Sequence, residues 1–168
     1  FCRTKNETKD VADMLIKDGY NSDALHGDLT QQQRDIVMNR YREKSLQLLI
    51  ATDVAARGID VSDVTHVINY ALPDDAENYT HRSGRTARAG KKGISISLVS
   101  KREMHKINEL ERIVSKKFEK VNVPTGAEVC QNQLLALIHR AQQVEVNEEQ
   151  LGPFMDQINA EFADMSKE

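Results

Sequence analysis

The sequence predicts an α/β fold, a three-layer sandwich with a mostly parallel sheet, followed by a small all-helical extension. Short apolar segments typical of strands alternate with amphipathic helix patterns through residue 118. The segment at 47–51 is apolar enough to be a central strand of a parallel sheet. After residue 120 the pattern becomes wholly helical. We therefore predict two domains, at 1–120 and 121–168.

The first elements are short and closely spaced. Phe1 and Cys2 have the character of the end of a strand, and residues 4–7 have the spacing of a capping box that starts a helix. A strand is expected at 20–25, and a second capping box at 30–33 predicts the next helix start. Apolar positions at helical spacing are expected to face the core. They are Val11, Ala12, Leu15 and Ile16 in the first helix, and Ile36, Val37 and Tyr41 in the second.

The following elements repeat this alternation. Strands are expected at 47–51, 64–69 and 93–99, the last with apolar residues at period two. Residues 74–77 start a helix that leads into an arginine-rich segment, and residues 100–103 cap another helix. The inward positions of this last helix are predicted to be Met104, Ile107, Leu110, Val114 and Phe118.

The tail pattern predicts two further helices. One begins with the cap at 125–128 and carries apolar residues on more than one side, and the other begins at 147–150 with a single apolar stripe. If the two helices pack together, part of their apolar surface remains uncovered, which is consistent with a partner subunit. The alternative is that the tail braces the core of its own chain.

Positive charge is concentrated in the middle of the chain. The net charge is −3 overall, but residues 81–120 carry +8 while the segments before and after it carry −5 and −6. Such a block attracts phosphates, either in a nucleotide or in a nucleic-acid backbone. A helix with lysine and arginine on its solvent-exposed face would have the same composition. No apolar run is long enough to cross a bilayer, and two distant cysteines predict no disulfide framework or metal site. A cytoplasmic location is expected.

Three arginines stand at a spacing of three in the segment from His81 to Gly90. If this segment forms a helical turn, Arg82, Arg85 and Arg88 project from nearly one side and form a cationic row. Guanidinium groups bind phosphate oxygens in pairs, which suits them to a polyphosphate. A solvated basic turn would have the same composition.

Polar residues follow each of the first four predicted strands. In an open parallel sheet the ligands gather beyond the carboxyl ends of the strands. These residues are Arg3 and Thr4, His26 and Gly27, Thr52 and Asp53, and Asn69 and Tyr70.

The segment from Ala51 to Val61 leaves a buried strand for a tight loop of small residues, which lets backbone amides approach a phosphate. Alone it would be an ordinary strand-to-helix turn. Followed by His-Arg-x-Gly-Arg-x-x-Arg, and preceded by Gln31-x-x-Arg34 after His26-Gly27, it resembles the carboxyl-terminal RecA-like domain of DEAD-box RNA helicases. The tail resembles, more weakly, the helical dimerisation extension of the bacterial cold-shock members.

The resemblance implies roles for individual residues. Arg85 and Arg88 match the arginine fingers of the γ-phosphate, while Asp60, Arg57 and Gly58 belong to the nucleotide site. Thr52, Gln31, Arg34 and Gly27 match residues that contact the RNA backbone. His81 and Arg82 match residues that couple the two helicase domains. Ser83 and Ala87 depart from the family pattern, where a larger aliphatic residue and a glycine are usual.

The resemblance also implies what lies elsewhere. The sequence has no Gly-x-x-x-x-Gly-Lys-Ser/Thr loop, so ATP and its Mg²⁺ are expected to need an amino-terminal RecA-like domain absent from this chain. The expected function is the carboxyl-terminal half of an ATP-dependent RNA helicase, with RNA and that domain as partners and a homodimer formed through 121–168. The alternatives are a DNA-directed translocase of the same superfamily and a non-catalytic RNA-binding dimerisation module.

Overall fold

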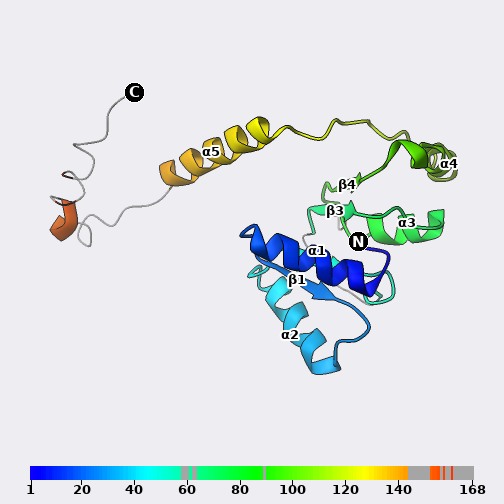
Figure 1. The fold of residues 1–168 in the computed structure, drawn as a ribbon, viewed down its shortest axis with the longest axis horizontal. Helices are drawn as coiled ribbons and strands as arrows, with labels where there is room; N and C mark the ends of the chain where they lie inside the picture. Colours follow the sequence, from blue (N-terminus) through cyan, green and yellow to red (C-terminus); the bar gives the residue numbers. More distant parts are fainter. Residues whose placement is uncertain are drawn as a thin grey trace. The chain divides into compact units, whose positions relative to one another are not determined.

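The computed structural model describes residues 1–57, 61, 64–88, 90–143, 152–155, 157 and 160. The chain divides into two compact units, residues 1–118 and 119–168. Figure 1 shows the first unit with its strands between helices.

The first unit contains two pairs of parallel strands. In one pair β1 (Ser22–Leu25) lies beside β2 (Leu48–Ala51), and in the other β3 (His66–Asn69) lies beside β4 (Ile94–Ser97). Residues Phe1 and Cys2 lie between the pairs. Cys2 N–H donates to the Ala51 carbonyl at 3.0 Å, and the Phe1 carbonyl accepts from Tyr70 N–H at 2.9 Å. The resulting order, β1, β2, residues 1–2, β3, β4, confirms the predicted parallel sheet.

Two helices cover opposite faces of the β1–β2 pair. Helix α1 (Lys5–Lys17) packs with Leu48 and Ile50, whereas helix α2 (Gln31–Arg42) packs with the alternate residues Leu49 and Ala51. Alternate side chains of a strand point to opposite faces, so β2 is apolar throughout. Both helices start at their predicted caps, because the hydroxyls of Thr4 and Thr30 accept bonds from backbone N–H groups three residues later.

The β3–β4 pair is covered on one face by the later helices. These are α3 (Ala76–Ser83) and α4 (Met104–Val114), the second preceded by the short 3₁₀ turn η1 (Lys101–Glu103). Their shared core contains Leu72, Tyr79, Ile107 and Leu110, with Phe118 packed edge-on against Tyr79. On the other face Ile68, Ile94 and Ile96 are about half exposed.

Three predicted core positions are wrong. Ile16 is 52% exposed, because α1 turns the side bearing Val11, Ala12 and Leu15 toward the sheet. Ile36 is 54% exposed, because α2 turns the side bearing Arg34, Val37, Met38 and Tyr41 toward the sheet and Ile36 lies behind it. Met104 is also exposed, since it forms the first turn of α4 while the next two turns bury Ile107 and Leu110.

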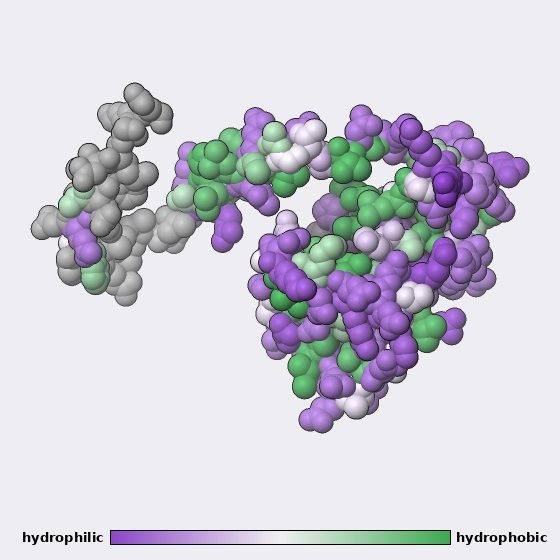
Figure 2. Space-filling model, in the orientation of Figure 1, coloured by the Kyte–Doolittle hydropathy of each residue, from purple (hydrophilic) through white to green (hydrophobic). Residues whose placement is uncertain are grey.

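The second unit contains helix α5 (Gly126–Gln142) and the short turn η2 (Gly152–Phe154). Helix α5 starts at the predicted capping box, in which Thr125 and Glu128 bond each other's backbone N–H. Its apolar side chains are exposed and lie along the helix as an apolar surface (Figure 2). Most of the helix predicted from residue 147 lies outside the described residues. In the part of the chain that the structure describes, no helix is long and apolar enough to cross a membrane.

Candidate functional site

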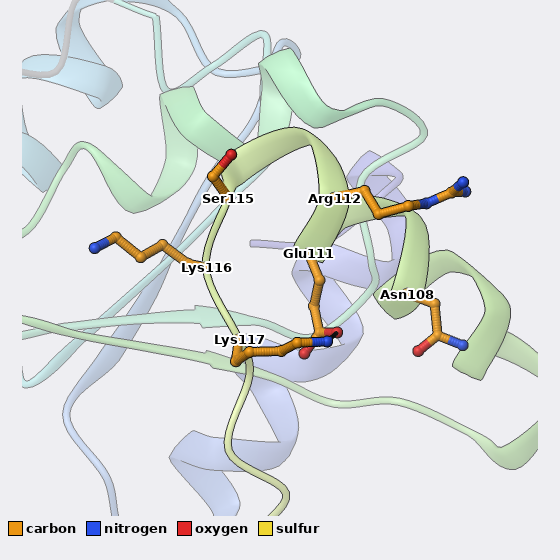
Figure 3. Close-up of a pocket in the computed structure, with 6 residues that line it drawn as sticks. All are labelled: Asn108, Glu111, Arg112, Ser115, Lys116 and Lys117. Atoms are coloured by element: carbon orange, nitrogen blue, oxygen red, sulfur yellow. Dashed lines mark hydrogen bonds and ion pairs between the residues drawn. The ribbon is translucent and has the colours of Figure 1, made fainter.

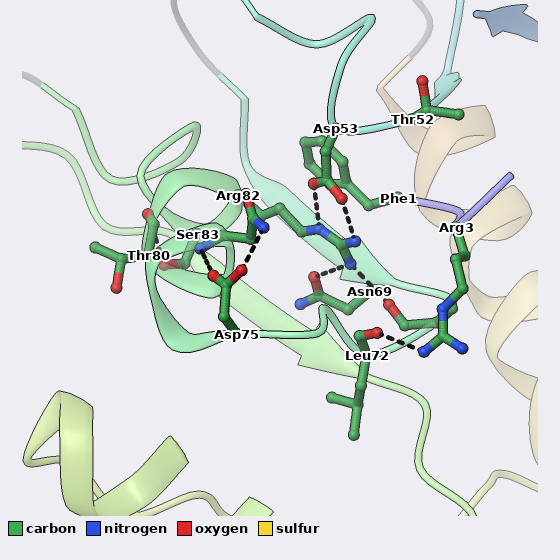
Figure 4. Close-up of polar contacts among 12 residues, drawn as sticks. Phe1, Arg3, Thr52, Asp53, Asn69, Leu72, Asp75, Thr80, Arg82 and Ser83 are labelled. Atoms are coloured by element: carbon green, nitrogen blue, oxygen red, sulfur yellow. Dashed lines mark hydrogen bonds and ion pairs between the residues drawn. The ribbon is translucent and has the colours of Figure 1, made fainter. Parts of the chain in front are cut away.

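The guanidinium of Arg82 lies inside the first unit, at the carboxyl ends of β2 and β3 (Figure 4). Its side chain is 3% exposed and binds both carboxylate oxygens of Asp53, through Nε at 2.6 Å and Nη2 at 2.7 Å. Nη1 donates to Asn69 Oδ1 at 3.1 Å and to the Ala71 carbonyl at 2.7 Å. The ring of Phe1 lies 5.2 Å from the guanidinium carbon. One arginine therefore ties the ends of β2 and β3 to each other and to Phe1, which lies between them.

The predicted row of three arginines is wrong. Helix α3 ends at Ser83, so the three side chains do not share a helical face. Arg82 points inward to Asp53, Arg85 is partly buried, and Arg88 is exposed with its Nε bonded to the Gly84 carbonyl at 2.8 Å. The spacing suggested a helix, but Gly84 ends it and the partly exposed carboxylate of Asp53 holds the first arginine.

The segment that carries the last two arginines is anchored by Thr86. This residue is 6% exposed, and its hydroxyl bonds the carbonyls of Val64 and Thr65 just before β3. A Cβ on Gly93 would lie 2.6 Å from the backbone nitrogen of Ala87, which is closer than Cβ atoms in proteins approach other heavy atoms. Gly93 thus lets the chain before β4 pass directly against the arginine segment.

Ala87 lies in the left-handed region, with φ of 56°, a backbone conformation that glycine adopts without strain. We predict that Ala87→Gly raises the free energy of unfolding by about 1 kcal/mol, because glycine removes the Cβ clash. Urea denaturation of the 168-residue chain measures it. The control is Ala76→Gly, in the first turn of α3, which should lower stability. If the Ala87→Gly protein were no more stable than the parent, the inferred backbone strain at Ala87 would be wrong.

The loop after β2 is held by helix α2. The Arg34 guanidinium donates to the carbonyl of Ala55, and also to that of Arg57 at 3.4 Å. Thr52 accepts from Ala55 N–H through its hydroxyl at 3.3 Å, while its carbonyl accepts from Ala56 N–H at 2.9 Å. Because the Thr52 hydroxyl accepts this bond, its own proton can point to an outside acceptor such as a phosphate oxygen.

The turn before α2 is built around His26. This residue is 5% exposed, and its Nδ1 accepts from Asp28 N–H at 3.3 Å. Burial, with a smaller effect from Lys9, lowers the pKa of His26, so the ring is neutral at pH 7 and accepts this bond. A hydrogen bond from Lys5 lowers the pKa of Asp28, which also lies 3.5 Å from Lys9. Gly27 lies exposed between these two residues.

The structure brings several predicted site residues together. Thr52 adjoins Asp53, which binds Arg82, while Arg34 binds the same loop. His81 is exposed on α3, 4.0 Å from Glu77, and Gln31 is exposed with its amide donating to Asp35 at 2.8 Å. Arg57 is exposed at the end of the loop. The predicted nucleotide residues Gly58 and Asp60 lie outside the described residues.

Sequence reasoning placed Asp53 and Asn69 at the ligand edge of the sheet but gave neither residue a role. Both stand directly after strands that were predicted, at the edge where polar groups gather. Asn69 is fully buried, and its amide also donates to the Ile96 carbonyl of the neighbouring strand at 3.3 Å. Their position was therefore visible in the sequence, but their partner, Arg82, comes from a different segment.

A separate surface depression lies at the end of α4 (Figure 3). It is lined by Asn108, Glu111, Arg112, Ser115, Lys116 and Lys117. Glu111 accepts from Lys117 Nζ and from the Phe118 backbone N–H, both at 2.8 Å, and these bonds lower its pKa. None of the predicted site residues lines it, and the acidic group inside it holds the chain that leaves α4.

A parallel sheet with helices on its faces and polar groups at the carboxyl ends of its strands defines an α/β domain of the class that binds ligands at that edge. Residues 1–90 match the Helicase conserved C-terminal domain family, and the chain belongs to that family. Residues 129–168 match the family described as Probable ATP-dependent RNA helicase, helical domain.

The relatives are DEAD-box proteins. The chain is 42% identical over 148 residues to the DEAD-box ATP-dependent RNA helicase CshA of Bacillus cereus, covering 88% of this chain and 28% of that protein. A DEAD box protein from Methanococcus jannaschii is similar with a TM-score of 0.68 and 49% identity, covering 73% and 34%. The structure of S. cerevisiae Dbp5 bound to RNA and ADP BeF3 is similar with a TM-score of 0.68 and 33% identity, and the match covers 83% of this chain and 37% of that one. The chain thus spans less than a third of the length of the CshA relatives.

Proposed function

We propose that this chain is the carboxyl-terminal half of an ATP-dependent DEAD-box RNA helicase. The observation that carries the proposal is the Asp53–Arg82 ion pair, which joins the loop that carries Thr52 to the segment that carries Arg85 and Arg88. A domain that binds RNA with one segment and ATP with the other needs both on a single rigid support. The proposed binding of RNA and ATP, together with the similarity to a bacterial helicase, supports a cytoplasmic location.

ATP is bound between this domain and the amino-terminal RecA-like domain. That domain holds the Mg²⁺ and most of the triphosphate, while Arg85 and Arg88 neutralise charge on the γ-phosphate as it is transferred. In this proposal Asp60 accepts from a ribose hydroxyl, and Arg57 and Gly58 also belong to the nucleotide site. The exposed side chain of Arg88 is consistent with this role.

RNA lies along the loop after β2 and the start of α2. The Thr52 hydroxyl donates to a backbone phosphate, and Gln31 and Gly27 provide polar contacts beside it. Arg34 has two roles, since it donates to the loop carbonyls and supplies positive charge beneath them. His81, exposed at the end of α3, contacts the amino-terminal domain when the two domains close. Arg82 belongs to the same coupling, from a buried position.

RNA binding by the intact protein tests this assignment. We expect Thr52→Val with Arg34→Ala to weaken binding and to reduce the slope of log affinity against log salt by about one, because one phosphate contact is lost. The matched control is Arg42→Ala at the other end of α2, which should leave the slope unchanged. An unchanged slope in the double variant would contradict the RNA site, and equal stimulation of ATP hydrolysis by DNA would favour a DNA-directed translocase.

The second unit is proposed to form a homodimer, and the functional boundary is placed at residues 120–121. Helix α5 exposes Leu134, Leu135, Leu137 and Ile138, each by more than two fifths of its surface. A second copy of the same helix covers such a surface most simply. Sedimentation of the 168-residue chain should show a dimer, and a chain ending at Pro124 should be a monomer. Two monomeric species would rule the dimer out.

A further inference from the structure

The ion pair between Asp53 and Arg82 has the geometry of a rigid connection. The Arg82 side chain is 3% exposed and that of Asp53 is 32% exposed, and two short parallel bonds join them. Two bonds between a planar guanidinium and a carboxylate fix the orientation of both groups. Asn69, the Ala71 carbonyl and the Phe1 ring hold the guanidinium from its other sides. Arg82 therefore cannot turn without moving the carboxylate.

Each end of this connection adjoins one proposed ligand site. Asp53 directly follows Thr52, the proposed RNA contact, in the chain. At the other end the Arg82 carbonyl accepts from Arg85 N–H at 3.0 Å, so the first proposed γ-phosphate arginine is bonded to Arg82 itself. A displacement of the loop by RNA would therefore reach the arginine segment through one ion pair and one backbone hydrogen bond.

Stability alone does not account for an ion pair at this place. Removing two charges from water costs about as much as their attraction returns, and well-packed apolar residues often support a fold equally well. Apolar contacts, however, permit sliding, whereas a bidentate pair transmits both position and orientation. A role in transmitting movement fits the pair better than a role in holding the fold.

We propose that Asp53 is a positioning residue that couples RNA binding at Thr52 to the placement of Arg85 and Arg88, acting through Arg82. The inference rests on the proposed function. It also assigns Arg82 an indirect role, within its own domain, in place of direct contact with the other domain. Because binding linkage is reciprocal, the pair strengthens nucleotide binding when RNA is bound by the same factor as it strengthens RNA binding when nucleotide is bound.

The experiment measures this factor in the intact helicase. The dissociation constant of a single-stranded RNA is determined with and without a non-hydrolysable ATP analogue, for the parent and for Asp53→Asn. We expect the ratio of the two constants to fall at least tenfold toward one in Asp53→Asn, with RNA affinity in the absence of nucleotide changed less than about threefold. Arg82→Lys, which keeps the charge but loses the paired bonds, should lower the ratio in the same way.

A matched control separates this effect from the loss of any ion pair. Asp23 on β1 binds Arg40 on α2 at 2.7 Å, and Asp23→Asn should leave the ratio at the parental value. A parental ratio in Asp53→Asn would overturn the inference. So would the loss of both binding activities together with a lowered melting temperature, since that pattern indicates a structural role alone. A parent protein in which RNA and nucleotide never affect each other's binding would instead refute the proposed function.

Discussion

Arg88→Ala in the intact helicase is expected to lower the rate of ATP hydrolysis by about a thousandfold or more, since an arginine on the transferred phosphoryl group contributes an effect of that order. Nucleotide binding should change little, because the arginine acts mainly on charge that develops in the transition state. RNA-stimulated phosphate release at saturating ATP gives the rate, and binding of a fluorescent nucleotide gives the affinity.

The control for this variant is Arg102→Ala. Arg102 is an exposed arginine of the same basic region, in the turn before α4, and its removal lowers the net charge equally. It should hydrolyse ATP at the parental rate. If Arg88→Ala also kept the parental rate, its assignment to the γ-phosphate would be wrong, whereas a slow rate in both variants would indicate an effect of net charge.

Arg82→Ala should destabilise the first unit by about 3 kcal/mol, the lower end of the range for a broken buried ion pair, because Asp53 is partly exposed to water. The substitution leaves Asp53 without its cation and Asn69, which is fully buried, without one of its partners. Thermal or urea unfolding of the 168-residue chain, monitored by circular dichroism, measures the loss.

Arg40→Ala provides the comparison for stability. It removes the arginine of the Asp23 pair, where the arginine is 48% exposed, and such pairs contribute about 0–1 kcal/mol. The difference between the two variants isolates the effect of burial. Equal losses would show that the Arg82 network contributes no more than a surface ion pair.

The helix starts were predictable because capping is local. Thr30 and Thr125 each find their partner three residues along the chain, so sequence spacing and geometry agree. The direction of an arginine side chain is not local. Arg34 was predicted to contact RNA and Arg82 to couple the two helicase domains. In the structure the first bonds the loop after β2 and the second bonds Asp53, in each case more than twenty residues away. Periodicity indicates which residues share a face, and cannot identify a buried partner from another segment.

The order of strands was likewise predictable only as a class. Alternating patterns indicated a parallel sheet, but the placement of Phe1 and Cys2 between β2 and β3 depends on backbone bonds that carry no side-chain signal. Ala87 shows the opposite case. A departure from the family pattern, visible in the sequence, marks a residue that the structure places at positive φ.

The two residues between the strand pairs also affect how the sheet opens. Within the described part of the chain, Cys2 bonds to Ala51 on one side, and Phe1 bonds to Ile68 and Tyr70 on the other. A ribbon of two strands alone is only marginally stable in water. Because only residues 1–2 of the described chain join the two strand pairs, the amide protons of each pair should exchange with solvent at a different rate. Exchange of the Cys2 and Tyr70 amide protons should report separation of the two pairs.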